Sequence, residues 1–274
     1  MSRITPLDLH HIHHATTGPP LLVLHGLLGS SRNWRSVAQF LARDFSVVTV
    51  DLRNHGQSPH ADEMDFAHLV ADVCSLIESH RWAEVHLLGH SLGGKVAMAL
   101  ALNFPDLLKT LMVVDIAPVA YKDRCSEIVR CLQAMRITQA TSRAAIDREL
   151  AESIPDSGLR QFLLMNLVAT SGGFRWSANL DALLQALPKL SSFPHVTRVA
   201  RFTKPTLFIA GGRSDYVGRH HLPAIHHLFP AAQITRLDRA GHWPHVENAD
   251  EFMATLGSFL RSAASSSSSI IGRS

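Results

Sequence analysis

A serine stands between two glycines in the segment Gly89-His90-Ser91-Leu92-Gly93. The apolar run at 85–89 before it is typical of a buried strand, and the apolar run after it is typical of a helix. A Gly-x-Ser-x-Gly turn between a strand and a helix holds its serine in a strained conformation that exposes the hydroxyl. Ser91 is therefore the candidate nucleophile, and the alternative is a plain turn serine.

A serine hydroxyl is a poor nucleophile at neutral pH and needs a histidine to take its proton. Among 18 histidines, His242 follows the last predicted strand (233–238) in a Gly-His loop. In catalytic triads built on this kind of turn, the order along the chain is serine, acid, histidine. The order favours His242 as the base, with His245 as a local rival.

The segment His25-Gly26-Leu27 follows another predicted strand, at 21–26. A sharp loop there can direct a backbone N–H group at the oxygen of a tetrahedral intermediate, together with the N–H group of the residue after the nucleophile. This pattern predicts Leu27 and Leu92 as the two oxyanion donors. A glycine loop that only turns the chain is the alternative.

The fold class predicted from the order of elements is α/β, with a mainly parallel sheet covered by helices on both faces. Its evidence is a set of apolar, strand-like runs that alternate with helix-like segments, at 21–26, 45–51, 85–89, 110–116, 206–212 and 233–238. Residues 118–203 show helical patterning and no convincing buried strand, so they are predicted to form a helical cap over the carboxyl edge of the sheet. The core is then 1–117 and 204–262, and the serine-rich segment 263–274 is predicted to be disordered.

The cap contributes apolar candidates for the roof of a binding pocket, which are Phe162, Leu163, Met165 and Leu167. For any one of them, packing against neighbouring helices is the favoured interpretation.

Composition excludes several classes of function. The net charge is +3, but the basic residues are scattered, so no nucleic-acid partner is predicted. The three cysteines have no CxxC spacing and predict neither disulfides nor a zinc site. The histidines at 10–14 and on the helix after 206–212 are predicted to be solvated surface residues and not metal ligands. The sequence has no secretory signal pattern and no apolar run that could span a membrane, so a cytoplasmic protein with no membrane partner is expected.

Together these motifs resemble the α/β-hydrolase superfamily, and within it the small esterases of the YbfF type, related to abhydrolase domain-containing protein eleven. The resemblance covers nearly the whole chain. It rests on LHGLLGSSRNW (24–34), DLRNHGQSP (51–59), GHSLGGKVAMALA (89–101), DIAPVAY (115–121), FRWSANLDAL (174–183) and AGHWPHVENAD (240–250).

The resemblance implies an α/β-hydrolase fold and a serine esterase that cleaves short or medium acyl esters or thioesters without a cofactor or metal. It also implies Ser91 as nucleophile and His242 as base. Two aspartates stand where the acid of the triad could be. Asp215 follows the predicted strand at 206–212, where most α/β hydrolases keep their acid, whereas Asp115 in DIAPVAY matches the YbfF-type esterases and is preferred.

Other functions remain open. The same constellation serves acyl-CoA thioesterases, perhydrolases and C–C hydrolases, and a small-molecule receptor with little turnover can keep this fold. The natural substrate and the oligomeric state do not follow from the sequence.

Overall fold

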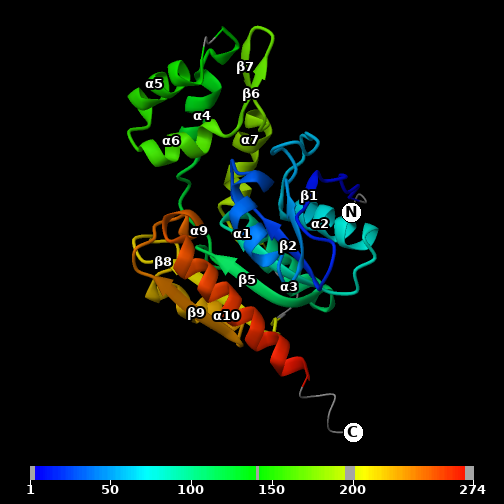
Figure 1. Ribbon diagram of the computed structural model, residues 1–274. Helices are drawn as coiled ribbons and strands as arrows, with labels where there is room; N and C mark the ends of the chain where they lie inside the picture. Colours follow the sequence, from blue (N-terminus) through cyan, green and yellow to red (C-terminus); the bar gives the residue numbers. More distant parts are fainter. Residues whose placement is uncertain (1–3, 140–141, 195–200, 269–274) are drawn as a thin grey trace.

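The computed structural model describes residues 4–139, 142–194 and 201–268. A seven-stranded sheet with the order β1-β3-β2-β4-β5-β8-β9 forms its centre (Figure 1). Only β1 is antiparallel to its neighbour, β3. The strands are β1 His11–His13, β2 Pro20–Leu24, β3 Ser46–Val50, β4 Val85–His90, β5 Leu108–Val114, β8 Thr206–Gly211 and β9 Ala232–Leu237.

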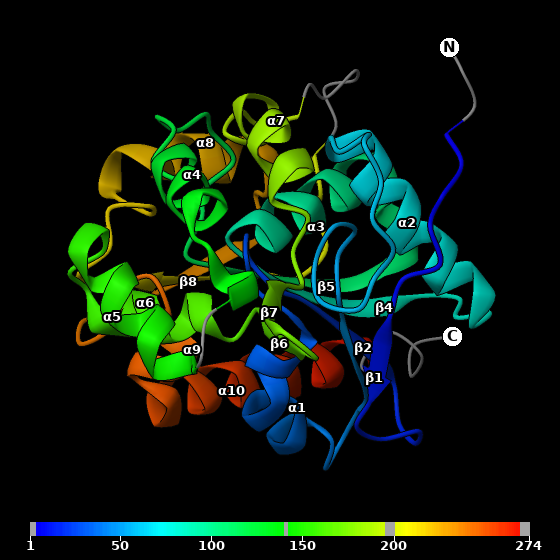
Figure 2. The same cartoon turned by 90° about the horizontal axis from the view of Figure 1, so that it is seen from above.

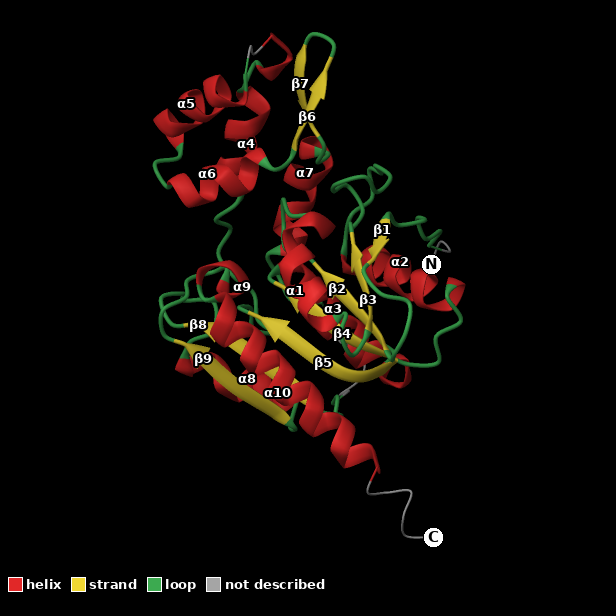
Figure 3. Cartoon of the chain, viewed as in Figure 1, coloured by secondary structure: helices red, strands yellow, loops and turns green. Residues whose placement is uncertain are grey.

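Helices cover both faces of the sheet, which explains why its central strands are apolar without alternation (Figure 3). In β2, Leu22 and Leu24 pack on the face covered by α2 and α3, whereas Leu21 and Val23 pack on the face covered by α1 and α10. The covering helices are α1 Arg35–Leu41, α2 Phe66–Ser79, α3 Leu92–Asn103, α8 Leu222–Leu228 and α10 Ala249–Ser268. Short helices η1 Ser31–Trp34, η2 Pro105–Leu107, η4 Arg219–His221 and α9 Pro244–Glu247 lie in the connections.

The insertion between β5 and β8 is mostly helical, and it lies at one end of the molecule (Figures 1 and 2). It contains α4 Ser126–Ala134, η3 Ile137–Gln139, α5 Arg143–Ser153, α6 Ser157–Leu164 and α7 Leu180–Leu190. It also contains an antiparallel hairpin, β6 Leu167–Thr170 with β7 Gly173–Trp176, that the helical patterning did not indicate. Both hairpin strands are four residues long and only partly buried, and they therefore differ from the buried strands that the sequence patterns identify. The boundaries of core and cap stay a prediction, and residues 195–200 of the predicted cap lie outside the described residues.

The prediction of disorder for 263–274 differs from the structure over its first part, because α10 continues through Ser268. Ala263 is buried, and alanine is the strongest helix former, so the helix extends past the point where the composition becomes serine-rich. Residues 269–274 lie outside the described residues. None of the described helices is both long enough and apolar enough to cross a bilayer.

Candidate active site

Ser91 lies at the junction of β4 and α3, with backbone angles φ 50° and ψ −115°. This conformation costs a non-glycine residue of the order of 1–3 kcal/mol, and the surrounding structure must impose it. The Ser91 N–H group donates to the carbonyl of Val114, and the Ser91 carbonyl accepts from the N–H group of Lys95. Strand and helix cross so closely that a Cβ on Gly89 would lie 2.3 Å from the carbonyl oxygen of Gly93. The glycine at position 89 of the pattern is therefore required, because any side chain there would clash with the helix.

His242 connects Ser91 to Asp115. Its Nε2 lies 3.1 Å from Ser91 Oγ, and its Nδ1 lies 2.8 Å from Asp115 Oδ2. Because an ionised carboxylate only accepts, Nδ1 carries the proton and Nε2 is free to accept one from the serine. The ring of Tyr216 stacks on the imidazole at 4.3 Å between centroids, and His90 Nε2 donates to the His242 carbonyl at 2.8 Å. These contacts fix the ring in the orientation that serine activation requires.

The Asp115 carboxylate is completely buried. A buried charge is tolerated when it is fully hydrogen-bonded, and Asp115 accepts from the Gly211 N–H group at 2.8 Å, from Ser214 Oγ at 2.5 Å and from His242. Its backbone also has a positive φ, 49°, directly after β5. Asp115 is therefore positioned to orient the imidazole and to stabilise its charged form.

Asp215, the alternative acid, lies elsewhere. Its exposed carboxylate forms two hydrogen bonds with Arg124, at 2.8 and 2.7 Å, and makes no hydrogen bond to His242. The Arg124 guanidinium lowers the pKa of this carboxyl. The structure therefore brings Asp115, and not Asp215, to the histidine.

Leu27 and Leu92 both line the cavity at Ser91, and among the described residues no backbone acceptor is found for either N–H group. Leu92 is the first residue of α3, where the helix dipole adds partial positive charge. Leu27 precedes Leu28, whose own N–H group donates to Nε2 of the buried His55 at 3.1 Å. The arrangement suits the two predicted oxyanion donors.

The loop that carries Leu27 is held by residues whose role the sequence did not reveal. His55 donates through Nδ1 to the Arg53 carbonyl, and His25 accepts from the Leu52 N–H group through Nε2. Arg53 itself is buried and forms a bidentate pair with Asp72, at 2.7 Å for both bonds. The segment RNHGQSP was visible as a family motif, but its contacts with the 25–29 loop depend on the fold.

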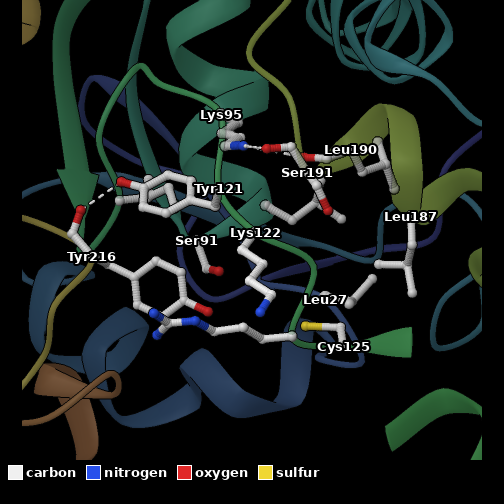
Figure 4. Close-up of a pocket in the computed structure, with 13 residues that line it drawn as sticks. Leu27, Ser91, Lys95, Tyr121, Lys122, Cys125, Leu187, Leu190, Ser191 and Tyr216 are labelled. Carbon is white, nitrogen blue, oxygen red and sulfur yellow. Dashed lines mark hydrogen bonds between the residues drawn. The ribbon is translucent and has the colours of Figure 1, made fainter. Parts of the chain in front are cut away.

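Two cavities meet at Ser91. One, of about 240 Å³, is lined by Leu159, Phe162 and Leu163 of α6 and by Trp243. The other, of about 70 Å³, extends toward Leu187 and Leu190 of α7, and Figure 4 shows Ser91 between these leucines and the rings of Tyr121 and Tyr216. Leu27, Arg124 and Cys125 line both cavities as well. Ser91 thus lies between a larger, mainly apolar cavity and a smaller one.

Comparison with known proteins identifies the family. The family model described as alpha/beta hydrolase fold matches residues 19–249. The chain belongs to the α/β-hydrolase fold family. Its relatives include the sn-1-specific diacylglycerol lipase ABHD11 of Mus musculus, 38% identical over 94% of this chain and 86% of the relative, and Esterase YbfF of Escherichia coli (strain K12), 30% identical over 88% and 92%. A solved structure titled marine microorganism esterase superposes with a TM-score of 0.89 at 34% identity, covering 92% of this chain and 99% of that one.

The resemblance and the fold class predicted from the sequence are confirmed for this α/β hydrolase. The predicted enzyme class, a carboxylic ester hydrolase, agrees with the relatives' names. Of the predicted roof residues, Phe162 and Leu163 line the larger cavity with Ser91, whereas Met165 and Leu167 line a separate polar groove. His245, the rival base, stacks on Trp34 at 4.1 Å and makes no hydrogen bond to Ser91.

Buried histidines behind the site make the stability of this α/β hydrolase sensitive to acid. Burial lowers the pKa of His245 to about 3, and burial also holds the pKa of His90 well below its ordinary value. In the unfolded chain these two histidines take up protons near pH 6.5, whereas in the folded chain they stay neutral to a much lower pH. The stabilisation is therefore complete above about pH 6.5 and is lost as the pH falls toward 3.

We expect His245→Phe to flatten this dependence by up to about one proton, or about 1.4 kcal/mol per pH unit between pH 6 and 4, because phenylalanine keeps the stack on Trp34 but does not titrate. Urea unfolding at several pH values measures the slope. His226→Gln is the control, because His226 is exposed on α8. An unchanged slope in His245→Phe would contradict the assignment.

Proposed function

We propose that this protein is a serine carboxylesterase that hydrolyses short to medium acyl esters, or thioesters of the same acyl groups, through an acyl-enzyme. The observation that carries the proposal is the continuous chain of hydrogen bonds from Ser91 Oγ through His242 to the buried Asp115. The names of the relatives, which include an esterase and a diacylglycerol lipase, support ester hydrolysis.

In the first half-reaction, Ser91 Oγ attacks the substrate carbonyl carbon while His242 Nε2 takes the hydroxyl proton. The negative charge that develops on the carbonyl oxygen is stabilised by the N–H groups of Leu27 and Leu92. The bond to the leaving group then breaks, and His242 returns the proton to the alcohol or thiol. Asp115 keeps the imidazole in the required tautomer and stabilises its charged form throughout.

In the second half-reaction, water attacks the acyl-enzyme carbonyl and His242 takes its proton. The ester bond to Ser91 breaks, the serine oxygen regains the proton, and the carboxylic acid leaves. No step needs a metal or an organic cofactor, and none is proposed for this reaction. Every proton transfer in both half-reactions passes through His242, which lies within hydrogen-bond reach of Ser91 and Asp115.

The size of the larger cavity supports the acyl-length proposal. Drug-sized ligands occupy pockets of about 300–1,000 Å³, and this cavity is smaller, at about 240 Å³. Its apolar lining from α6 suits a hydrocarbon chain of limited length. The cavity of about 70 Å³ on the other side of Ser91 suits a small group.

Ser91→Ala should lower kcat by several orders of magnitude while the fold persists, because the nucleophile and base act as one unit. Turnover of p-nitrophenyl butyrate measures the loss, and a fluorophosphonate probe tests whether Ser91 is the residue modified. A labelled serine with very low turnover on every acyl ester and thioester would favour a receptor function. Absence of any adduct on Ser91 would overturn the esterase proposal.

The two aspartates provide a matched pair. Asp115→Asn should lower kcat by up to about ten-thousand-fold, because the amide would leave His242 in the wrong tautomer. Asp215→Asn removes an exposed ion pair with Arg124 and should keep at least about a tenth of the activity. Steady-state kinetics of both variants shows which aspartate is the acid of the triad. A larger loss of kcat in Asp215→Asn than in Asp115→Asn would assign the acid to Asp215.

The cap residue Phe162 tests the acyl pocket. Its ring contacts Trp243 at 5.4 Å between centroids and lines the larger cavity. Phe162→Ala should enlarge the cavity and shift the ratio of kcat/KM values toward longer acyl chains, measured with p-nitrophenyl esters of increasing length. Phe104→Ala, an equal truncation of an exposed ring outside this cavity, is the control. The same profile in both variants would place the acyl chain elsewhere.

A further inference from the structure

Three imidazoles from two distant segments of the chain meet at the edge of the sheet. His11 and His13 lie two residues apart on β1 and so share one face of the strand, and His80 follows the last residue of α2. One ring nitrogen from each lies within 4.8 Å of the others, and the ring centroids are 5.1 to 5.3 Å apart. Among the described residues this is the one group of three or more potential metal ligands.

Backbone carbonyls fix the tautomers of two of these rings. His11 Nδ1 lies 2.8 Å from the Leu9 carbonyl, and His80 Nδ1 lies 3.0 Å from the Leu76 carbonyl. A carbonyl oxygen can only accept, so Nδ1 carries the proton and Nε2 carries a lone pair in both rings. Metal-binding histidines are oriented by the same kind of bond from their second nitrogen. His80 therefore presents to His13 the lone-pair nitrogen that a metal ion needs.

The third ring completes the arrangement. His13 Nε2 lies 3.4 Å from His80 Nε2. Two imidazole nitrogens bound to one zinc ion at 2.0–2.1 Å in tetrahedral geometry lie about 3.4 Å apart. The spacing of this pair matches ligation, and one ring nitrogen of His11 lies within 4.8 Å of the ligand nitrogens of the other two rings.

The backbone holds His80 in place independently of any ligand. The end of α2 is a Schellman motif, in which the Arg81 N–H group donates to the Glu78 carbonyl and the Trp82 N–H group to the Ile77 carbonyl. Arg81 adopts a φ of 55°, a conformation in which glycine is usual. The His80 ring also stacks on Trp82 at 4.3 Å. The three histidines thus come from an edge strand and from a capped helix end.

We propose that His11, His13 and His80 bind a divalent transition-metal ion that prefers imidazole, with zinc, copper or nickel as the chemical class. Neutral imidazoles do not suit magnesium or calcium, which take oxygen ligands. Three protein ligands leave a fourth position for water. The ion would join the edge strand β1 to the end of α2 and stabilise the folded chain by mass action.

The site is separate from the proposed esterase chemistry. In the sheet, β3 and β2 lie between β1 and β4, the strand that leads to Ser91. None of the three histidines lines either cavity at Ser91. The histidines at 10–14 were predicted to lie on a solvated edge strand, and nothing in that segment of the sequence points to a third ligand at position 80.

Isothermal titration of tag-free, chelator-treated protein with ZnCl₂ and with CuCl₂ tests the proposal. Wild type should bind one equivalent of metal, with a rise in Tm on addition of zinc. His13→Gln and His80→Gln should each weaken binding at least about tenfold, since the loss of even an orienting partner costs 10–100-fold. With copper, the electron paramagnetic resonance spectrum should show nitrogen hyperfine splitting that is reduced in both variants.

The double variant His226→Gln/His227→Gln controls for adventitious binding, because these adjacent histidines are exposed on α8 and should leave the titration unchanged. Fluorophosphonate labelling of Ser91 reports whether each variant is folded. Equal binding by wild type, His13→Gln and His80→Gln would overturn the proposal, as would the absence of one-equivalent binding in folded wild type.

Discussion

The strained backbone at Ser91 is the constraint around which the site is organised. A residue with φ 50° and ψ −115° persists only where its neighbours determine it. Here α3 must turn back against the ends of β2 and β4, and a Cβ at Gly93 would lie 2.5 Å from the His25 carbonyl oxygen. The contact that demands glycine therefore also places the 25–29 loop beside the serine. One close crossing of three backbones brings the nucleophile and one oxyanion donor together.

The parallel register of β4 and β5 places Asp115, the acid, beside Ser91. His90 pairs with Val114, so the next residue of each strand, Ser91 and Asp115, leaves the sheet at the same level. Both adopt a positive φ, which turns them away from the strand direction at the carboxyl edge. Asp115 is then covered by Gly211 and Ser214 from the end of β8. Adjacent strands that end in register thus position a serine and a buried carboxylate on either side of one histidine.

Local patterns explain what the sequence could predict. The turn at Ser91, the loop at His25 and the position of His242 are each defined within a few residues, and the alternation of apolar runs is enough for the fold class. The choice between Asp115 and Asp215 rested on resemblance, because both follow strands that end at the same edge. What separates them is their partners in the fold, because Asp115 is bonded to His242 whereas Asp215 is bonded to Arg124.

Contacts between distant segments explain what the sequence could not predict. His55 accepts from the Leu28 N–H group across 27 residues, and Asn166 of the insertion between β5 and β8 donates to the Leu28 carbonyl across 138 residues. No spacing rule connects such pairs, because they depend on which loops the completed sheet brings to one edge. The β6–β7 hairpin was missed because its two four-residue strands are only partly buried, so no buried apolar strand marks them in the sequence.

The histidines show how the environment assigns different chemistry to one side chain. His242 is partly exposed and bonded to a carboxylate, which suits an imidazole that must gain and lose a proton. His25 and His55 are fully buried among backbone groups, and burial lowers the pKa of both, so they act as fixed, neutral hydrogen-bonding units. A general base also has to be neutral before it can accept a proton. Low pH is therefore unfavourable to this site in two ways. A protonated base cannot accept the serine proton in the proposed chemistry, and protonation of the buried imidazoles would place charges where they hold the Leu28 loop.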